Sequence, residues 1–210
     1  MLNGTLLIGF TAAALVVLVI PGPGVVYVVA RSLAQGRKAG LVSVTGLAAG
    51  AFLHVIAAAI GLSAILLASS TAFSFVKLIG AGYLIYLGIR ALLTRSSIEA
   101  VENLESQSFR RLFVDGVIIS AFNPKIAIFF LAFLPQFVDA SLDAVSKQIL
   151  LLGVIYVGLA LTTDGAYALF ASSLRRWVSG RLVGSSLPRY LTGGIYILLG
   201  INAALVGKHT

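Results

Sequence analysis

The chain contains no cysteine among its 210 residues, so it has no disulfide framework, no thiolate metal site and no cysteine nucleophile. Charge is also scarce: only 10% of the residues are charged, whereas soluble domains usually carry about a quarter. Neither an H-E-x-x-H nor a G-x-S-x-G motif occurs, and there are only 2 histidines. We therefore predict that the chain is not an enzyme and that it needs no metal or other cofactor.

The sequence is rich in apolar residues, and many of them form long runs. Apolar residues make up 59% of the chain, and its mean hydropathy is +1.04. Apolar runs of about 20 residues are typical of membrane-spanning helices. We identify six, at about 6–30, 41–66, 73–93, 112–137, 146–171 and 189–207. The sequence therefore predicts an all-α polytopic membrane protein with six transmembrane helices, folded as a single domain over residues 1–210.

The basic residues, 15 against 7 acidic ones, gather in alternate loops. Those after the first, third and fifth runs hold Arg31, Arg37, Lys38, Arg90, Arg95, Arg110, Arg111, Arg175, Arg176, Arg181 and Arg189. The positive-inside rule places these three loops in the cytoplasm, which predicts that both termini lie outside. This alternation explains the net positive charge better than nucleic-acid binding does, so we expect a lipid bilayer and no nucleic acid as partner.

The sequence also repeats itself. The segments "IGAGYLIYLGIRALL" (79–93) and "LTGGIYILLGINAAL" (191–205) align without gaps, with two glycines in register. This predicts two three-helix repeats, at about 1–93 and 112–210, joined by a cytoplasmic loop at about 94–111. Because three is an odd number, the second repeat crosses the membrane in the opposite sense, as in many secondary transporters.

Two apolar runs are interrupted by helix-breaking residues. The first contains "IPGPGV" (20–25) and the fourth contains Asn123-Pro124-Lys125. At 1.5 Å per residue, the breaks lie about 15 Å from Arg31 and about 18 Å from Arg111. Both depths are near the middle of a hydrocarbon core about 30 Å thick. We therefore predict that helices 1 and 4 are broken at the membrane midplane.

Each break has the residues that begin a new helix. Asparagine is a strong N-cap and proline suits the first helical turn, so Asn123-Pro124 and Gly22-Pro23 both predict a restart. A restart leaves backbone N–H groups at the positive end of a helix dipole, and a bilayer tolerates these only beside a cavity or a ligand. A proline kink healed by neighbouring helices is the alternative. Two breaks at matched depth favour a substrate site.

Three ionisable residues lie deep within the apolar runs, namely Lys125, Asp164 and His54. A charge at the bilayer centre costs about 2.5–3.5 kcal/mol, so such residues usually have a function. Asp164 is our first candidate for a proton carrier and His54 the second, because imidazole exchanges protons near neutral pH. The alternatives are that Lys125 extends to the membrane surface and that His54 only bonds a neighbouring helix.

Gly46 and Gly50 form a small-xxx-small pattern in the second run. Such a pattern lets two helices approach closely, either within one chain or across a homodimer. We expect packing within the chain and keep the homodimer as the alternative.

Three segments resemble the LysE/RhtB family of amino-acid exporters: "PGPGVVYVVARSLAQGRKAGLVSVTGLAAGAFLH", "GAGYLIYLGIRALL" and "NPKIAIFFLAFLPQF". The resemblance extends over nearly the whole chain. It implies a multi-pass efflux carrier of the bacterial inner membrane, driven by the proton gradient. The family's motif positions correspond to Pro21, Gly22, Pro23, Gly24, Asn123, Pro124 and Lys125, with Asp164 as the acidic position of the fifth helix.

A zwitterionic amino acid needs one anion site and one cation site. We expect the helix restarts and Lys125 to bind its carboxylate. Asp164, or the carbonyl end of a broken half-helix, would bind its ammonium group. Family substrates include homoserine, threonine, lactones, leucine and lysine, and the motifs do not choose among them. A channel or a structural subunit without coupled transport is the competing interpretation.

Overall fold

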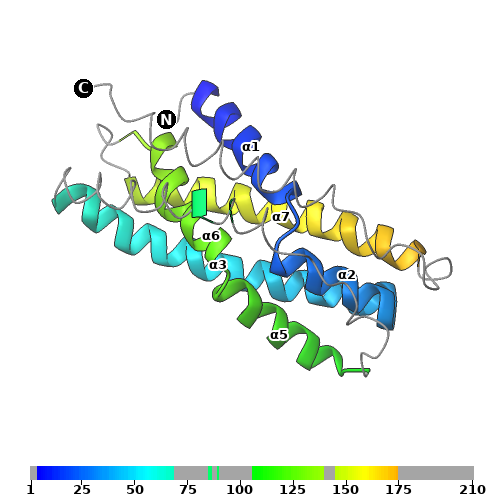
Figure 1. The fold of residues 1–210 in the computed structure, drawn as a ribbon. Helices are drawn as coiled ribbons and strands as arrows, with labels where there is room; N and C mark the ends of the chain where they lie inside the picture. Colours follow the sequence, from blue (N-terminus) through cyan, green and yellow to red (C-terminus); the bar gives the residue numbers. More distant parts are fainter. Residues whose placement is uncertain (1–3, 69–84, 87–88, 90–105, 140–144, 175–210) are drawn as a thin grey trace.

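The fold was examined in a computed structural model, which describes residues 4–68, 85–86, 89, 106–139 and 145–174 (Figure 1). Regular structure in these residues is entirely helical. With the labels of Figure 1, the α-helices are α1 (Gly4–Val19), α2 (Pro23–Gln35), α3 (Arg37–Ala68), α5 (Phe109–Ala121), α6 (Pro124–Ile128) and α7 (Val145–Leu174). A π-helical turn (Phe129–Phe133) and a 3-10 turn (Leu134–Phe137) continue α6. The all-α prediction is confirmed for these residues.

Four of the predicted spans correspond to described helices. Two single helices are long and apolar enough to cross a membrane, over Arg37–Gly61 and Val145–Ser173. Two bent pairs pass the same test together, Gly4–Val19 with Pro23–Gln35 and Phe109–Ala121 with Pro124–Phe137. The predicted spans 73–93, apart from residues 85, 86 and 89, and 189–207 lie outside the described residues. The chain is therefore a multi-pass membrane protein in which a broken helix precedes a long unbroken one twice.

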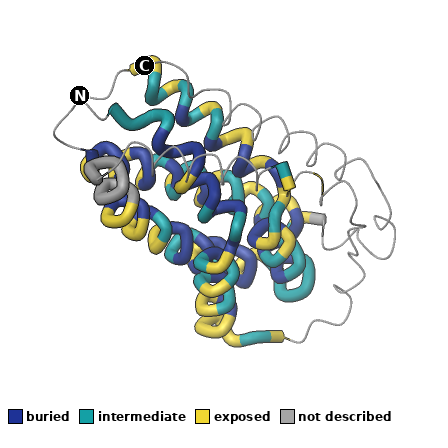
Figure 2. The backbone as a smooth tube through the Cα atoms, turned by 60° about the vertical axis from the view of Figure 1, so that its left-hand side comes forward, coloured by how far each residue is buried: buried dark blue, intermediate teal, exposed yellow. Residues whose placement is uncertain are grey.

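The broken helices pack against the two long ones. α3 lies against α5 and α7, while α1 and α2 both contact α7 (Figure 1). An apolar core rich in aromatic rings joins them, including the buried Phe10, Phe129 and Tyr156. Exposed positions are spread along the helices in Figure 2, and many carry large apolar side chains, such as Phe122 and Ile8. Apolar side chains suit such surfaces because lipid, unlike water, solvates them.

Glycines allow α3 and α5 to approach at backbone distance. A Cβ atom added at Gly50 would lie 2.5 Å from the Val117 carbonyl oxygen, and one added at Gly46 would overlap the carbonyl oxygen of Phe113. From the other side, a Cβ at Gly116 would lie 2.8 Å from the carbonyl oxygen of Ser43. The small-xxx-small pattern thus serves packing within the chain, as predicted, and it is covered by α5 rather than open to a second copy.

Replacing Gly46 by Ala should therefore destabilise the fold, because the new methyl group meets backbone that cannot rotate away. We expect a lower melting temperature in detergent and a lower yield of folded protein. Gly61→Ala is the matched control in the same helix, since its Cβ meets nothing within 4 Å among the described residues. Alanine favours a helix over glycine by about 0.8–1 kcal/mol, so the control should hold or raise the melting temperature. Equal melting temperatures for the two variants would contradict this packing.

Candidate functional site

The first break separates α1 from α2 and bends the chain by 54°. Gly22 is the N-cap of α2 and Pro23 its first residue, as predicted. Proline has no N–H, and the Val26 N–H donates to the Gly22 carbonyl oxygen at 3.0 Å. Between them, the N–H groups of Gly24 and Val25 make no hydrogen bond with any described residue. This restart therefore presents two free donors at the positive end of a helix dipole.

The second break separates α5 from α6 and bends the chain by 44°. Asn123 is the N-cap, and its Oδ1 accepts a hydrogen bond of 3.0 Å from the Lys125 N–H. The Ile126 and Ala127 N–H groups both donate to the Asn123 carbonyl oxygen at 3.1 Å. The predicted restart is confirmed, but its N–H groups are already bound within the chain. The two breaks therefore differ: of the two restarts, it is that of α2 whose first turn has N–H groups without a partner among the described residues.

The Lys125 side chain connects the two breaks. Only 6% of this residue is exposed, and its Nζ donates to the carbonyl oxygens of Val17 at 3.0 Å and Ile20 at 2.7 Å. Carbonyls at the end of a helix have no partner within it, and the negative end of the helix dipole favours a cation. Lys125 thus satisfies the end of α1, and its buried position excludes the alternative that it extends to the membrane surface.

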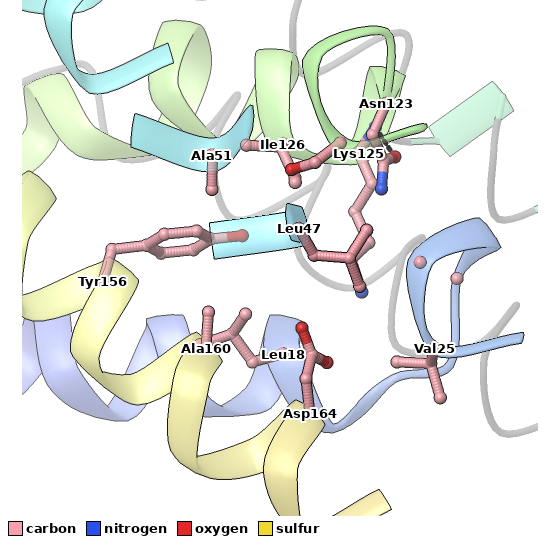
Figure 3. Close-up of a pocket in the computed structure, with 13 residues that line it drawn as sticks. Leu18, Val25, Leu47, Ala51, Asn123, Lys125, Ile126, Tyr156, Ala160 and Asp164 are labelled. Carbon is pink, nitrogen blue, oxygen red and sulfur yellow. Dashed lines mark hydrogen bonds between the residues drawn. The ribbon is translucent and has the colours of Figure 1, made fainter. Parts of the chain in front are cut away.

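Asp164 projects from α7 on the facing side, toward Lys125 (Figure 3). The two charges attract each other, but no ion pair of 4.0 Å or less joins them. No hydrogen bond from a described residue reaches the half-buried Asp164 carboxylate. One turn later, the Tyr167 hydroxyl donates to the Val19 carbonyl oxygen at 2.7 Å. The α1 end therefore has donors from both α6 and α7, while the carboxylate remains available.

A small cavity lies where these groups meet (Figure 3). Its lining comes from all six described α-helices and from both breaks: Leu18, Gly22, Gly24, Val25, Leu47, Ala51, Ser120, Asn123, Lys125, Ile126, Tyr156, Ala160 and Asp164. The cavity volume of about 30 Å³ is enough for about two water molecules. A larger ligand therefore requires the surrounding side chains to move.

The cavity brings together five of the residues predicted from the motifs, namely Gly22, Gly24, Asn123, Lys125 and Asp164. The three prolines of the motifs are not among its lining residues. Pro23 and Pro124 begin α2 and α6, and Pro21 lies between α1 and α2. Their contribution is to the path of the backbone. No cluster of three or more potential metal ligands occurs in the described part of the chain.

His54 does not line the cavity. It lies on α3, where its Nε2 is 3.1 Å from the Ser120 carbonyl oxygen and its ring stacks on Phe130. Because a carbonyl oxygen only accepts, this nitrogen carries the proton in the hydrogen bond. The interpretation of His54 as an interhelical hydrogen bonder is thus confirmed, while its role in proton coupling stays a prediction.

Some lining residues were not anticipated from the sequence. Tyr156 and Ala160 precede Asp164 at intervals of four residues, so helical periodicity would have placed them on one face of α7 once Asp164 was chosen. Leu47 and Ala51 share the same spacing on α3. Ser120 had no such signal. It is fully buried, and its hydroxyl has no hydrogen-bond partner among the described residues.

Comparison with known proteins agrees with this architecture. The sequence pattern of the LysE type translocator family matches residues 15–207. The chain belongs to this family. Proteins of the LysE type are translocators, so the prediction that the chain is a transporter and not an enzyme is confirmed. No solved structure matches the chain.

Individual relatives in the LysE family cover most of the chain. A membrane protein of Vibrio cholerae serotype O1, described as uncharacterized, is 31% identical over 94% of this chain and 95% of its own length. The homoserine/homoserine lactone efflux protein of Salmonella typhimurium is 29% identical over 86% of each chain. The leucine efflux protein of Salmonella choleraesuis is 30% identical over 63% of each.

Proposed function

We propose that this LysE family member is a secondary exporter that moves amino acids or close derivatives out of the bacterial cell across the inner membrane, in exchange for protons. One observation carries the proposal: two broken helices meet at a cavity lined by a buried cation, a carboxylate and two residues whose N–H groups have no partner among the described residues. Irregular backbone at membrane depth is tolerated where it lines such a cavity. The relatives named as homoserine and leucine efflux proteins support the same substrate class.

The arrangement suits a zwitterion. The substrate carboxylate would accept from the Gly24 and Val25 N–H groups at the start of α2, with the Lys125 ammonium as its counter-charge. The substrate ammonium would bind Asp164 and the carbonyl end of α1. Both charges of the substrate are then matched, as burial in a medium of low dielectric constant requires.

The remaining lining accommodates the substrate side chain. Leu47, Ala51, Ile126 and Ala160 are apolar, while Ser120 and Tyr156 bring hydroxyl groups, and that of Ser120 has no partner among the described residues. A largely apolar wall with two hydroxyls suits an uncharged side chain such as those of leucine or homoserine. Asp164 is the single acidic residue in the fifth apolar run, so a basic side chain would find no second carboxylate there.

The orientation proposed from the basic loops completes the mechanism. Two inverted repeats, with both termini outside, would let one half rock against the other and open the cavity to either side in turn. The two bent pairs, each followed by a long helix, support this plan. Lys125 joins the halves directly, since it reaches from α6 to α1.

Purified protein in liposomes should test the function. With unlabelled amino acid inside and a trace of labelled amino acid outside, a carrier accumulates the label transiently above equilibrium, because loaded states exchange across the membrane. We expect such counterflow for homoserine, threonine or leucine, and faster net movement when a pH difference is applied. A channel only equilibrates the label. If the label overshoots equilibrium with no amino acid of the panel, carrier function is contradicted.

A further inference from the structure

The Lys125 ammonium is bound by the carbonyls of α1 rather than by the nearest carboxylate. Its two hydrogen bonds, to Val17 and Ile20, are 3.0 and 2.7 Å long, while Asp164 lies beyond ion-pair distance. The chain passes close beside it, since a Cβ atom added at Gly22 would lie 3.5 Å from Nζ. A primary ammonium group therefore already fills this end of the cavity.

The substrate ammonium proposed above would need the same place. It would have to bind near Asp164 and the end of α1, where the carbonyl oxygens of Val17 and Ile20 are occupied by Lys125. The cavity of about 30 Å³ is also too small for a whole amino acid while Lys125 stays in this position. Binding of an amino acid therefore requires Lys125 to leave these carbonyls.

We propose that Lys125 is a tethered cation that fills the ammonium site of the empty carrier, and that the ammonium group of the substrate displaces it. This inference rests on the proposed function for the identity of the displacing ligand. The displaced Lys125 ammonium turns to the substrate carboxylate, so each charge exchanges one partner for another. The ligand class of the site at the end of α1 is a primary ammonium.

A tethered cation solves a problem of the empty carrier. Without substrate and without the lysine, the carbonyl oxygens of Val17 and Ile20 would lose their donors, and an unpaired buried carbonyl costs free energy comparable to a lost hydrogen bond. Lys125 satisfies the carbonyls of Val17 and Ile20, and Tyr167 satisfies that of Val19. Because neutral carbonyls hold the lysine, Asp164 keeps its carboxylate available for a proton or for the substrate.

Removal of the tether should create a binding site for a small amine. Lys125→Ala deletes three methylene groups and the ammonium, which together correspond to n-propylammonium. At ten times its Kd, this probe should raise the melting temperature of the variant in detergent by about 3–6 °C. It should leave the wild type and the exposed-lysine control Lys147→Ala unchanged. Propanol and propionate, which lack the ammonium, should have no effect on any of the three.

A second measurement tests displacement. Leucinamide has the ammonium but no carboxylate, so in the wild type it displaces Lys125 without offering it a partner. In Lys125→Ala nothing has to be displaced, and we expect leucinamide to bind about tenfold more tightly than to the wild type. Leucine should change in the opposite direction, because it loses the partner of its carboxylate. If Lys125 only binds the substrate carboxylate and is not displaced, leucinamide should bind the wild type and Lys125→Ala equally tightly. That result would overturn the proposal.

Lys125→Gln serves as a second host if Lys125→Ala does not fold, because its amide can still donate to a carbonyl while the charge is gone. Stabilisation of either variant by propylammonium supports the ammonium site even if no amino acid is exported, so the two proposals can fail separately. An absence of stabilisation in a folded variant would rule out the tethered cation.

Discussion

Asp164→Asn should abolish the pH-driven accumulation of substrate against its concentration gradient. It should preserve the exchange of substrate between two pools of equal concentration. The carboxylate projects into the cavity and accepts no hydrogen bond from a described residue, so both a proton and an ammonium group can reach it. If the two compete for Asp164, substrate leaves as a proton enters. Asparagine has nearly the same shape and remains polar, but it cannot take up a proton. The variant then binds and exchanges substrate without coupling to the gradient.

The experiment is an accumulation measurement in liposomes with an imposed pH difference. One pH unit coupled to one proton per substrate supports an accumulation ratio of about tenfold, equivalent to about 1.4 kcal/mol. We expect a ratio near one for Asp164→Asn. Asp115→Asn is the matched control, because the partly exposed Asp115 lies outside the cavity and pairs at i,i+4 with the exposed Arg111 at 3.9 Å, a kind of pair that contributes little to stability. The control should accumulate substrate as the wild type does.

Accumulation by Asp164→Asn would move the coupling role to another group. His54 would then be tested first, with His54→Gln retaining a donor for the Ser120 carbonyl oxygen while removing the imidazole. His54 lies outside the cavity lining, so coupling through it would have to act on the end of α5 rather than on the ligand directly.

The helix breaks could be predicted from the sequence because their chemistry is local. Proline has no N–H and fixes φ, so a few neighbouring residue types are enough to identify where a helix ends and where the next one begins. Asn123 and Gly22 both occupy the N-cap position that the sequence predicted. The packing role of Gly46 and Gly50 was also predictable, since only close helix contact favours glycine at that spacing.

The partners of Lys125 could not be predicted in the same way. They are backbone carbonyls 105 and 108 residues away, and every residue has such a group, so no side chain marks Val17 or Ile20 as acceptors. The Asn123 side chain was expected to cap α6, but the bond from the Ile126 N–H to the Asn123 carbonyl oxygen depends on backbone geometry. For this reason the sequence assigned equivalent anion-binding roles to both restarts, whereas among the described residues the α2 restart has donors without a partner and the α6 restart has none.

Asn123→Leu should reduce export by more than tenfold while leaving the protein inserted in the membrane. Its side-chain oxygen binds the Lys125 N–H at 3.0 Å, and residue 123 is only 4% exposed. Leucine fills similar space but accepts no hydrogen bond, so a buried N–H is left unpaired at a cost of about 1–3 kcal/mol. The start of α6 would shift, and with it the Lys125 side chain that reaches the end of α1.

Two further substitutions at this position separate capping from ligand binding. Serine is also a strong N-cap, so Asn123→Ser should restore export to within a few-fold of the wild type. Asn123→Asp keeps the cap too, but it places a carboxylate beside Lys125, where it competes with that of the substrate; export should therefore fall although α6 is intact. Equal export by the serine, aspartate and leucine variants would mean that the second break shapes only the path of the chain. Recovery with serine alone would show that the second break acts by positioning the Lys125 side chain across the cavity. It would also show that the negative charge next to Lys125 must be the carboxylate of the substrate.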